Sequence, residues 1–185
     1  MNNPIRNLVC LEEQLEYTDR QKLLEICREL KTESVSQKLA GNIERQYLLS
    51  EEGIEIIRPI LNLALSGETN RRSWMIDAWV NFQKKHEFNP LHNHSGLWSF
   101  VLWLDIPYNI DDELSLPWVK NSNSPSASIF SLVHMNPLGE LTTEDFFLDK
   151  KDNGRMLIFP SKMYHVVYPF YTSDDYRISI SGNLV

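Results

Sequence analysis

Cysteine is scarce in this sequence. Its 185 residues include two cysteines, Cys10 and Cys27, both in the N-terminal segment. They form neither the disulfide framework of a small secreted protein nor a closely spaced pair of thiolate metal ligands. The first residues also lack the charged-then-apolar pattern of a secretory signal. We therefore expect a protein of a reducing cytoplasm.

Positive charge and long apolar runs are lacking as well. The 18 lysines and arginines are outnumbered by 25 acidic residues, which gives a formal net charge of −7. Because non-specific affinity for nucleic acid depends on clustered cations, a nucleic-acid partner is not expected. The apolar runs are too short or too interrupted by charge to span a bilayer. The hydrophobic content of 42% is that of a globular protein, and the length suits one domain.

Two amphipathic helices are predicted in the first 70 residues. Residues 18–31 carry apolar side chains at helical spacing, with Thr18 and Gln21 placed as a capping box. Residues 50–66 form a second such segment. Pro59 lies inside it and should kink or restart the helix, because proline removes a backbone donor.

The apolar period changes to strict alternation from Arg72 onward, which indicates a strand. Further strands are predicted near residues 91–95, 97–106, 128–135, 143–149, 155–159, 164–169 and 176–183. The polar stretch 121–128 reads as a loop and a candidate mobile flap, and Asp152-Asn153-Gly154 as a tight turn. Helices followed by many strands predict a mainly β protein, a sandwich or barrel supported by N-terminal helices.

Two histidines, His92 and His94, stand one residue apart in the stretch NPLHNHSGLWSFVLWLDIP. On a strand, residues i and i+2 share a face, so the two imidazoles would lie side by side as ligands of a transition metal. A third ligand must then come from elsewhere, and His165 in MLIFPSKMYHVVYPF is the candidate. The alternative is that these are ordinary core or surface histidines, because so short a motif often occurs by chance.

Arg177 and Ser179 follow in the stretch RISISGN, again two residues apart. An inward arginine on an apolar strand is costly unless it meets an anion, and its planar guanidinium suits a carboxylate. Ser179 would add a hydroxyl donor to the same carboxylate. The alternative is an edge-strand arginine that faces water.

The blocks HNHSG…SFVLWL, FPSKMYH and RISISGN occur in this order over residues 74–185. Together they resemble the 2-oxoglutarate- and Fe(II)-dependent oxygenases, in particular a branch of short enzymes often found in bacteriophages. The resemblance implies one oxygenase domain over 1–185, with helical support in 1–70. It further implies a double-stranded β-helix, a cupin-like jelly roll, in 71–185, and the cytoplasm of a bacterial host as its place of action.

The resemblance also implies a ligand set and a reaction. His92, His94 and His165 would bind Fe(II), while Arg177 and Ser179 would hold the distal carboxylate of 2-oxoglutarate. The enzyme would use O2 to hydroxylate an unidentified substrate, with a peptide side chain as the first choice, and would release succinate and CO2.

One position departs from the family pattern. Asp or Glu usually stands two residues after the first histidine, where this chain has His94. Either His94 ligates directly, which strand geometry favours, or a carboxylate such as Glu87 or Asp145 reaches the metal.

Other positions keep two interpretations. Asn81 is a donor to the co-substrate or a polar residue on the outer face, and Trp103 is a wall of the co-substrate pocket or a core aromatic. His86 and His134 lack a partner at i+2 and are assigned to structure or surface. Tyr164 precedes His165 on a strand and should point away from it.

Two other functions remain open. A cupin-like three-histidine enzyme would use the metal without 2-oxoglutarate and would not need Arg177. A non-enzymatic jelly-roll module, such as a virion or sugar-binding component, would have incidental histidines. The oligomeric state is open too, because Trp79, Trp98 and Trp118 suit a core, a substrate platform or an interface equally well.

Overall fold

Two antiparallel sheets face each other in the computed structural model, which describes residues 10–185 except 31, 32, 70 and 72. The larger sheet has six strands in the order β1 (Leu11–Gln14), β8 (Arg155–Pro160), β5 (Trp98–Asp105), β10 (Arg177–Leu184), β3 (Ile76–Gln83) and β2 (Arg45–Leu48). The smaller sheet has four, in the order β4 (Asn89–His92), β9 (Tyr164–Val167), β6 (Phe130–Met135) and β7 (Leu141–Phe146). The mainly β jelly roll predicted from the sequence is confirmed.

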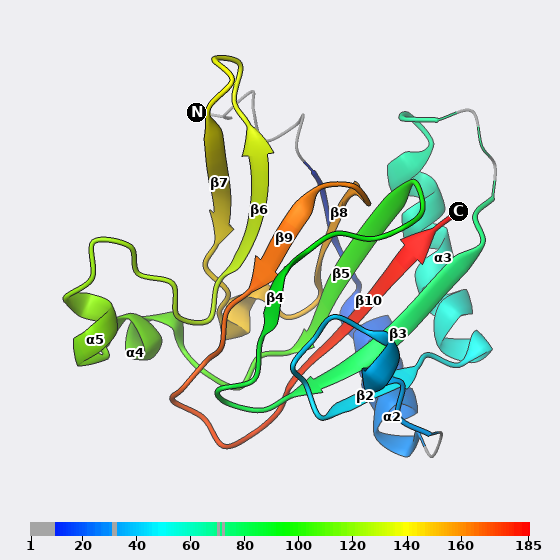
Figure 1. The fold of residues 1–185 in the computed structure, drawn as a ribbon. Coiled ribbons are helices and arrows are strands. Elements are labelled where there is room, and N and C mark those ends of the chain that lie inside the picture. Colours follow the sequence, from blue (N-terminus) through cyan, green and yellow to red (C-terminus); the bar gives the residue numbers. More distant parts are fainter. Residues whose placement is uncertain (1–9, 31–32, 70, 72) are drawn as a thin grey trace.

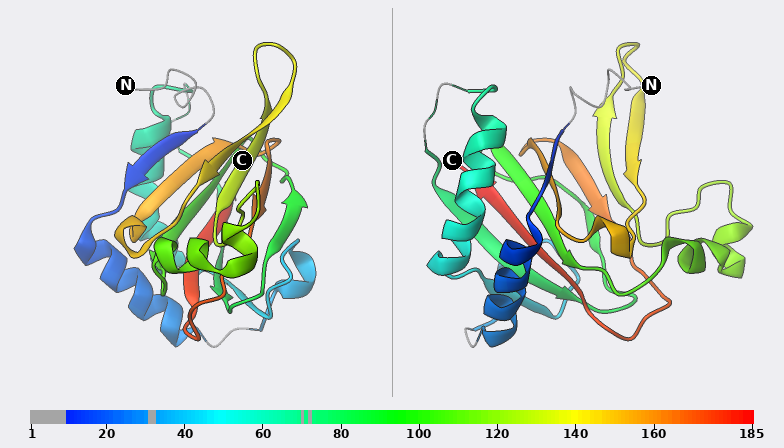
Figure 2. Two further views of the ribbon diagram at one scale, coloured as in Figure 1. Left: turned by 90° about the vertical axis from the view of Figure 1, so that its left-hand side faces the viewer. Right: turned by 180° about the vertical axis from the view of Figure 1, so that it is seen from behind.

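Two helices, α2 (Tyr17–Glu29) and α3 (Glu51–Leu65), cover the outer face of the larger sheet (Figures 1 and 2). Their apolar sides join one buried cluster with the sheet residues that point outward, among them Val80 and Ile180. A second buried cluster, which includes Trp103 and Phe130, lies between the two sheets. The inner face of the larger sheet thus contributes to this core and, at β3 and β10, also lines a pocket.

The helices differ in detail from their predictions. The prediction of a capping box formed by Thr18 and Gln21 was wrong. Helix α2 begins at Tyr17, and its N-cap residue Glu16 makes no side-chain hydrogen bond to the helix end. Thr18 thus lies inside the first turn. The predicted restart of the helix at Pro59 was wrong as well, because α3 is continuous through this residue, and the predicted kink stays a prediction. Residue 31, the predicted end of the first helix, lies outside the described residues.

Some elements were not predicted. The short strands β1 and β2 occur in the region expected to be helical, and both pair at the two outer edges of the larger sheet. Short helices α4 (Ile110–Ser115) and α5 (Pro117–Lys120) lie between β5 and β6, and 3-10 turns occur at Ser36–Lys38 and Lys150–Asp152. The strand expected from position 72, itself outside the described residues, begins at Ile76. Within the described part of the chain, no helix has the length and apolar character needed to cross a membrane.

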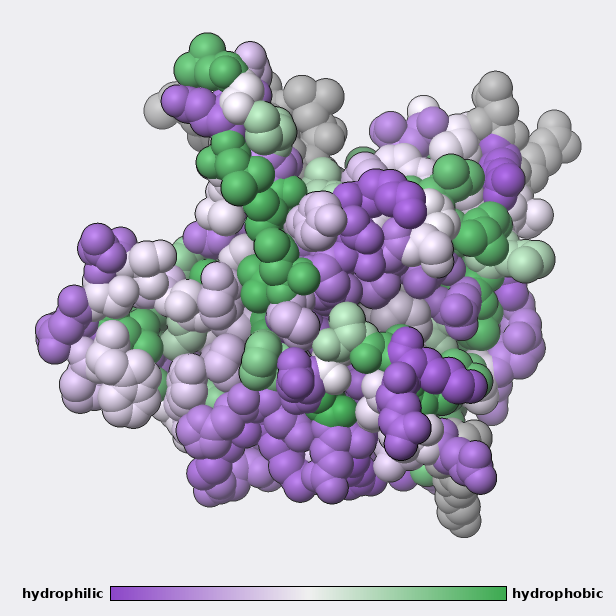
Figure 3. Space-filling model, viewed as in Figure 1, coloured by the Kyte–Doolittle hydropathy of each residue, from purple (hydrophilic) through white to green (hydrophobic). Residues whose placement is uncertain are grey.

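The β6–β7 hairpin projects beyond the rest of the molecule (Figures 1 and 2). Apolar side chains gather along it in the space-filling view (Figure 3). Met135, Leu138 and Leu141 are 60%, 83% and 74% exposed. This strip belongs to the outside of the molecule and has no part in either buried cluster.

Candidate active site

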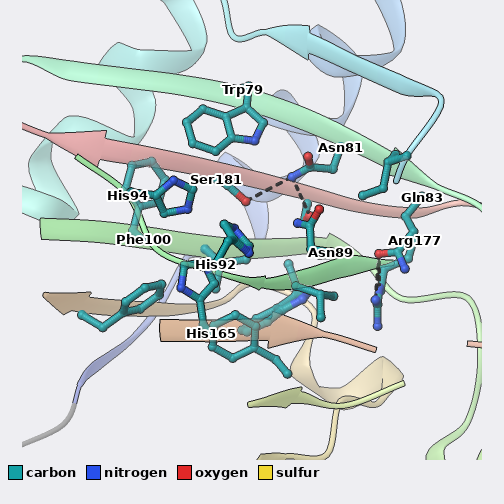
Figure 4. Close-up of a pocket in the computed structure, with 17 residues that line it drawn as sticks. Trp79, Asn81, Gln83, Asn89, His92, His94, Phe100, His165, Arg177 and Ser181 are labelled. Carbon is teal, nitrogen blue, oxygen red and sulfur yellow. Dashed lines mark hydrogen bonds between the residues drawn. The ribbon is translucent and has the colours of Figure 1, made fainter. Parts of the chain in front are cut away.

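Three histidines converge at one end of the space between the sheets (Figure 4). His92 on β4 lies directly opposite His165 on β9 in the antiparallel register. Their ring centroids are 4.2 Å apart, and His94 is 4.9 and 5.0 Å from the two. One ligand nitrogen of each ring lies within 4.8 Å of the others. The structure thus brings together the three histidines that the sequence singled out.

His94 reaches this position from a loop. The strand predicted over residues 91–95 was wrong in its end, because β4 stops at His92. The backbone N–H of His94 donates to the carbonyl of Ser161 at 2.9 Å, which takes the chain away from the ladder with β9. The ring of His94 packs against Trp79, with centroids 5.6 Å apart. Its orientation is therefore set by the loop and by Trp79 rather than by strand alternation.

Backbone carbonyls select the tautomer of two of these rings. Nδ1 of His92 lies 2.6 Å from the carbonyl of Pro90, and Nδ1 of His165 lies 3.1 Å from that of Met163. A carbonyl oxygen can only accept, so each Nδ1 carries the proton and donates it. Each Nε2 then keeps a free lone pair, as in many metal-binding histidines.

All three imidazoles are held in the neutral form. Burial and, to a smaller extent, the neighbouring His92 ring lower the pKa of His165 to about 3. Burial, followed by the effect of His92, lowers the pKa of His94 to about 4, and burial also lowers that of His92. A metal binds only the deprotonated imidazole nitrogen. Three neutral, convergent nitrogen donors fit a divalent transition metal such as Fe(II).

The two carboxylates proposed as substitutes are engaged elsewhere. Asp145 accepts a hydrogen bond from the Ser131 hydroxyl at 2.6 Å. Glu87 accepts the backbone N–H groups of Glu44 and Lys84. Among the residues that the structure describes, neither carboxylate belongs to the group of possible metal ligands. The geometry favours direct ligation by His94, and its role as a ligand stays a prediction.

The pocket floor is a ladder of side chains on β3 and β10. Because alternate residues of a strand share a face, the register places three pairs side by side. These pairs are Trp79–Ser181, Asn81–Ser179 and Gln83–Arg177, and all six residues line the pocket. Trp103 on the neighbouring β5 lies opposite Ser179, is 1% exposed and also lines the pocket. Trp103 contacts Phe130 as well, with ring centroids 5.6 Å apart, so it is both pocket wall and core aromatic.

Asn81 is the centre of a polar network on this floor. It is 3% exposed, so the interpretation as an outer-face residue was wrong. Its Nδ2 donates to the hydroxyls of Ser179 and Ser181, and its Oδ1 accepts from Nε2 of Gln46 at 2.7 Å. Gln46 lies on β2, which the sequence did not reveal. Its Oε1, like Oδ1 of Asn89, is buried and has no hydrogen-bond partner among the residues that the structure describes.

Arg177 lies at the other end of the pocket from the histidines (Figure 4). Its side chain is 1% exposed, so the alternative of a water-facing arginine was wrong. Nε and NH2 donate to Oε1 of Gln83, NH1 donates to the Tyr108 hydroxyl and the Ser128 carbonyl, and NH2 also donates to the Tyr168 carbonyl. Within the described residues no carboxylate lies within 4.0 Å of it. A buried guanidinium surrounded by neutral acceptors fits an anionic ligand.

The sequence did not single out the partners of Arg177. Gln83 has a signal, because it continues the alternation of Trp79 and Asn81 on β3. Ser128 has none. Its backbone φ of 59° lies in the left-handed region, which turns its carbonyl toward Arg177. Ser128 ends the polar stretch 121–128, whose role as a flap stays a prediction.

The remaining histidines and Tyr164 lie outside this group. His86 makes an edge-on ring contact with Tyr171, with centroids 5.3 Å apart, and His134 contacts the carbonyl of Met135. Tyr164 is half-exposed while His165 is buried, as strand alternation predicts.

Fold and site together define a jelly-roll protein with a three-imidazole centre and a buried arginine in one pocket. The chain belongs to the 2-oxoglutarate- and Fe(II)-dependent oxygenases: residues 77–183 match the family model described as "Putative 2OG-Fe(II) oxygenase". This match covers more than half of the chain and all the site residues above except Gln46. Fe(II) and 2-oxoglutarate are the cofactor and co-substrate of this family. No curated protein matches the chain.

Solved structures share the fold at low sequence identity. A Pseudomonas putida prolyl-4-hydroxylase superposes with a TM-score of 0.60 at 12% identity, over 95% of this chain and 91% of that one. A 2OG-Fe(II) family oxidoreductase from Burkholderia pseudomallei has a TM-score of 0.63 at 12% identity, over 96% and 86%. A Trichoplax adhaerens prolyl hydroxylase, in complex with a peptide fragment of hypoxia inducible factor, has 0.60 at 14% identity, over 97% and 84%. The fold is therefore that of the prolyl-hydroxylase-like oxygenases.

Proposed function

We propose that this oxygenase hydroxylates a peptide side chain and converts 2-oxoglutarate to succinate and CO2. The observation that carries the proposal is the placement of His92, His94, His165 and Arg177 around one pocket, with the imidazoles and the guanidinium at opposite ends (Figure 4). A co-substrate that chelates a metal through one end and carries an anion at the other suits this arrangement.

Each group has a distinct task in this proposal. His92, His94 and His165 hold Fe(II) through their unprotonated nitrogens. Bound iron would supply the activation of O2 that is coupled to decarboxylation of the co-substrate. Arg177 and Ser179 hold the distal carboxylate of 2-oxoglutarate and thereby orient its other end.

Aromatic side chains pack against the metal-binding end of the pocket. Phe159 and Phe130 lie against His165, with ring centroids 4.9 and 5.7 Å away. Exclusion of water strengthens the electrostatic contacts inside the site and protects a strong oxidant from side reactions. These side chains make no direct chemical contribution to the reaction.

The preference for a peptide rests on fold likeness. The Pseudomonas putida structure is a prolyl-4-hydroxylase, and the Trichoplax adhaerens structure holds a peptide fragment. Because one fold supports many substrates, the identity of the substrate needs a test of its own. The test is to offer proline-containing peptides with Fe(II), O2 and 2-oxoglutarate, and to look by mass spectrometry for the gain of one oxygen together with succinate.

The first experiment is an anaerobic titration of Fe(II) with and without 2-oxoglutarate. A visible charge-transfer band marks a 2-oxoacid chelated to iron. We expect the band in the wild type, its loss in His94→Ala, and a much higher 2-oxoglutarate requirement in Arg177→Ala. His134→Ala is the control, because this histidine lies outside the pocket lining.

Other results would favour the rival functions. Tight iron binding without the band would favour a three-histidine enzyme that does not use 2-oxoglutarate. Absence of metal binding would favour a non-enzymatic jelly-roll module.

A further inference from the structure

Gln83 lines the pocket beside Arg177 and accepts two hydrogen bonds from its guanidinium. We infer that Gln83 is a neutral placeholder for the distal carboxylate of 2-oxoglutarate: it satisfies the buried guanidinium in the free protein and is displaced when the co-substrate binds. This inference rests on the proposed function and concerns a residue whose role nothing else assigns.

The first support is that the guanidinium has no free donor. Its five N–H groups are all used, by Oε1 of Gln83, the Tyr108 hydroxyl, and the Ser128 and Tyr168 carbonyls. A carboxylate can therefore bind Arg177 only by replacing one of these acceptors.

The second support is that only one acceptor is placed to leave. Ser128 and Tyr168 offer backbone carbonyls, which are fixed by the chain. Tyr108 is 2% exposed and stacks on Phe170, with centroids 5.0 Å apart. Of these four acceptors Gln83 is the one whose residue lines the pocket, directly opposite Arg177 in the strand register. Its displacement requires a side-chain rotation and no change in the backbone.

The third support is the hydrogen-bond geometry. One oxygen of Gln83 accepts both Nε, at 3.1 Å, and NH2, at 2.7 Å. A carboxylate offers two oxygens to the same two donors and adds a negative charge to a cation that has no carboxylate within 4.0 Å among the described residues. The exchange therefore favours an anion strongly, whereas a neutral group gains nothing over the amide. Gln83 would in this way select a 2-oxoacid with a distal carboxylate over one without.

The amide has a fixed orientation in the free protein. Its Nε2 donates to the backbone carbonyl of Glu87, so its oxygen must face Arg177. These contacts with Arg177 and Glu87 hold the Gln83 amide at the place where the carboxylate of 2-oxoglutarate would bind. Removal of the side chain should therefore destabilise the free protein more than the complex.

The test measures binding of 2-oxoglutarate and of 2-oxopentanoate, which lacks the distal carboxylate, to the Fe(II)-loaded protein under anaerobic conditions. The readout is the charge-transfer band, with melting temperature as a second measurement. The variants are Gln83→Ala, which empties the position, and Gln83→Glu, which fills it with a charge. Gln37→Glu, at an exposed position, adds the same charge away from the pocket as a control.

We expect Gln83→Glu to weaken 2-oxoglutarate binding about 100-fold, because its carboxylate pairs with Arg177, while 2-oxopentanoate binding changes little. Gln83→Ala should bind 2-oxoglutarate at least about 3-fold more tightly than the wild type, because the co-substrate no longer has to break the hydrogen bonds between Arg177 and Gln83. Its melting temperature should fall without ligand and rise more on addition of 2-oxoglutarate than that of the wild type.

Two results would overturn this inference and leave the proposed function intact. Weaker 2-oxoglutarate binding in a folded Gln83→Ala would mean that Gln83 itself contacts the co-substrate. Unchanged 2-oxoglutarate binding in Gln83→Glu would mean that the carboxylate binds elsewhere. If the wild type gives no band with 2-oxoglutarate, the proposed function fails first and the inference falls with it.

Discussion

At the scale of single residues, protonation separates His94 and His165 from ordinary histidines. Their pKa values are lowered to about 4 and about 3 by burial, against an ordinary value of 6.5 in the unfolded chain. Between these values the unfolded state binds more protons, so the free energy of unfolding falls as the pH drops below about 6.5. Near pH 5 the difference is about two protons, or about 2.7 kcal/mol per pH unit.

Urea unfolding of the metal-free protein at pH 7, 6 and 5 checks this expectation. The double variant His94→Asn/His165→Asn should lose most of the pH dependence in this range. A wild-type stability that stays level from pH 7 to pH 5 would contradict the neutral, buried state of the two rings.

Glu113 is the buried carboxylate whose loss should cost the most stability. It is fully buried on α4 and accepts the backbone N–H groups of Tyr171 and Thr172 and the hydroxyl of Thr172. Glu113→Ala leaves three donors without a partner and should lower the free energy of unfolding by about 2–4 kcal/mol. Chemical denaturation measures this, with Asp111→Ala at an exposed position of the same helix as the control. Equal stabilities of the two variants would contradict it.

The sequence reveals a site residue only when a short motif around that residue indicates its role. His92, His94, His165 and Arg177 stand in short motifs whose spacing carries chemistry, and the structure brings them into one pocket. Gln46 and Glu113 act on residues 35 and 58 or 59 positions away. Neither carries a local pattern, so only the folded chain reveals them.

At the scale of elements, α3 tolerates a proline at an exposed position in its middle. Proline in a helix interior costs about 3 kcal/mol relative to alanine, partly offset by the lower entropy of the unfolded chain. Pro59→Ala should therefore raise the free energy of unfolding by about 1–2 kcal/mol, measured as a higher urea midpoint. Leu63→Ala, one turn further along the exposed side, should change it little. A lower midpoint for Pro59→Ala would mean that the packing of α3 on the sheet requires the proline.

Elements with a strong period were predicted and those formed by tertiary pairing were missed. The alternation on β3 and the apolar runs of β5, β8 and β10 give clear strand signals. β1 (LEEQ) and β2 (RQYL) are four residues long and mostly polar, and they become strands because they pair with the edges of β8 and β3. His94 leaves β4 for the same kind of reason, since its backbone finds a partner in Ser161.

At the scale of the whole molecule, the β6–β7 hairpin exposes an apolar strip (Figure 3). Exposed apolar patches promote association, and β7 is also an edge strand. The double variant Leu138→Lys/Leu141→Lys should remain monodisperse at higher protein concentration in light scattering. Its free energy of unfolding should change by less than about 0.5 kcal/mol, because neither side chain is buried. Thr143→Lys on the same strand controls for charge, and equal effects of both variants would contradict a role of the apolar strip.

The order of elements predicted a β-sandwich or barrel supported by N-terminal helices, and the family resemblance narrowed this to a jelly roll. The strand order in the two sheets and the placement of α2 and α3 on the outer face depend on long-range contacts that the sequence does not display. A single domain over residues 1–185, a phage origin and a cytoplasmic location stay predictions.

The ladder of β3 and β10 also has a consequence for the size of the co-substrate. Successive pairs on one face of an antiparallel sheet are about 7 Å apart, and a shift of one residue turns a side chain to the other face. Moving the arginine from position 177 to 179 would thus shorten the reach from the imidazoles by a whole pair, several methylene groups at once. The strand register is therefore too coarse to distinguish dicarboxylates that differ by one carbon. We expect this discrimination to depend on the side chains between the two ends of the pocket, first of all on the pair Asn81 and Ser179.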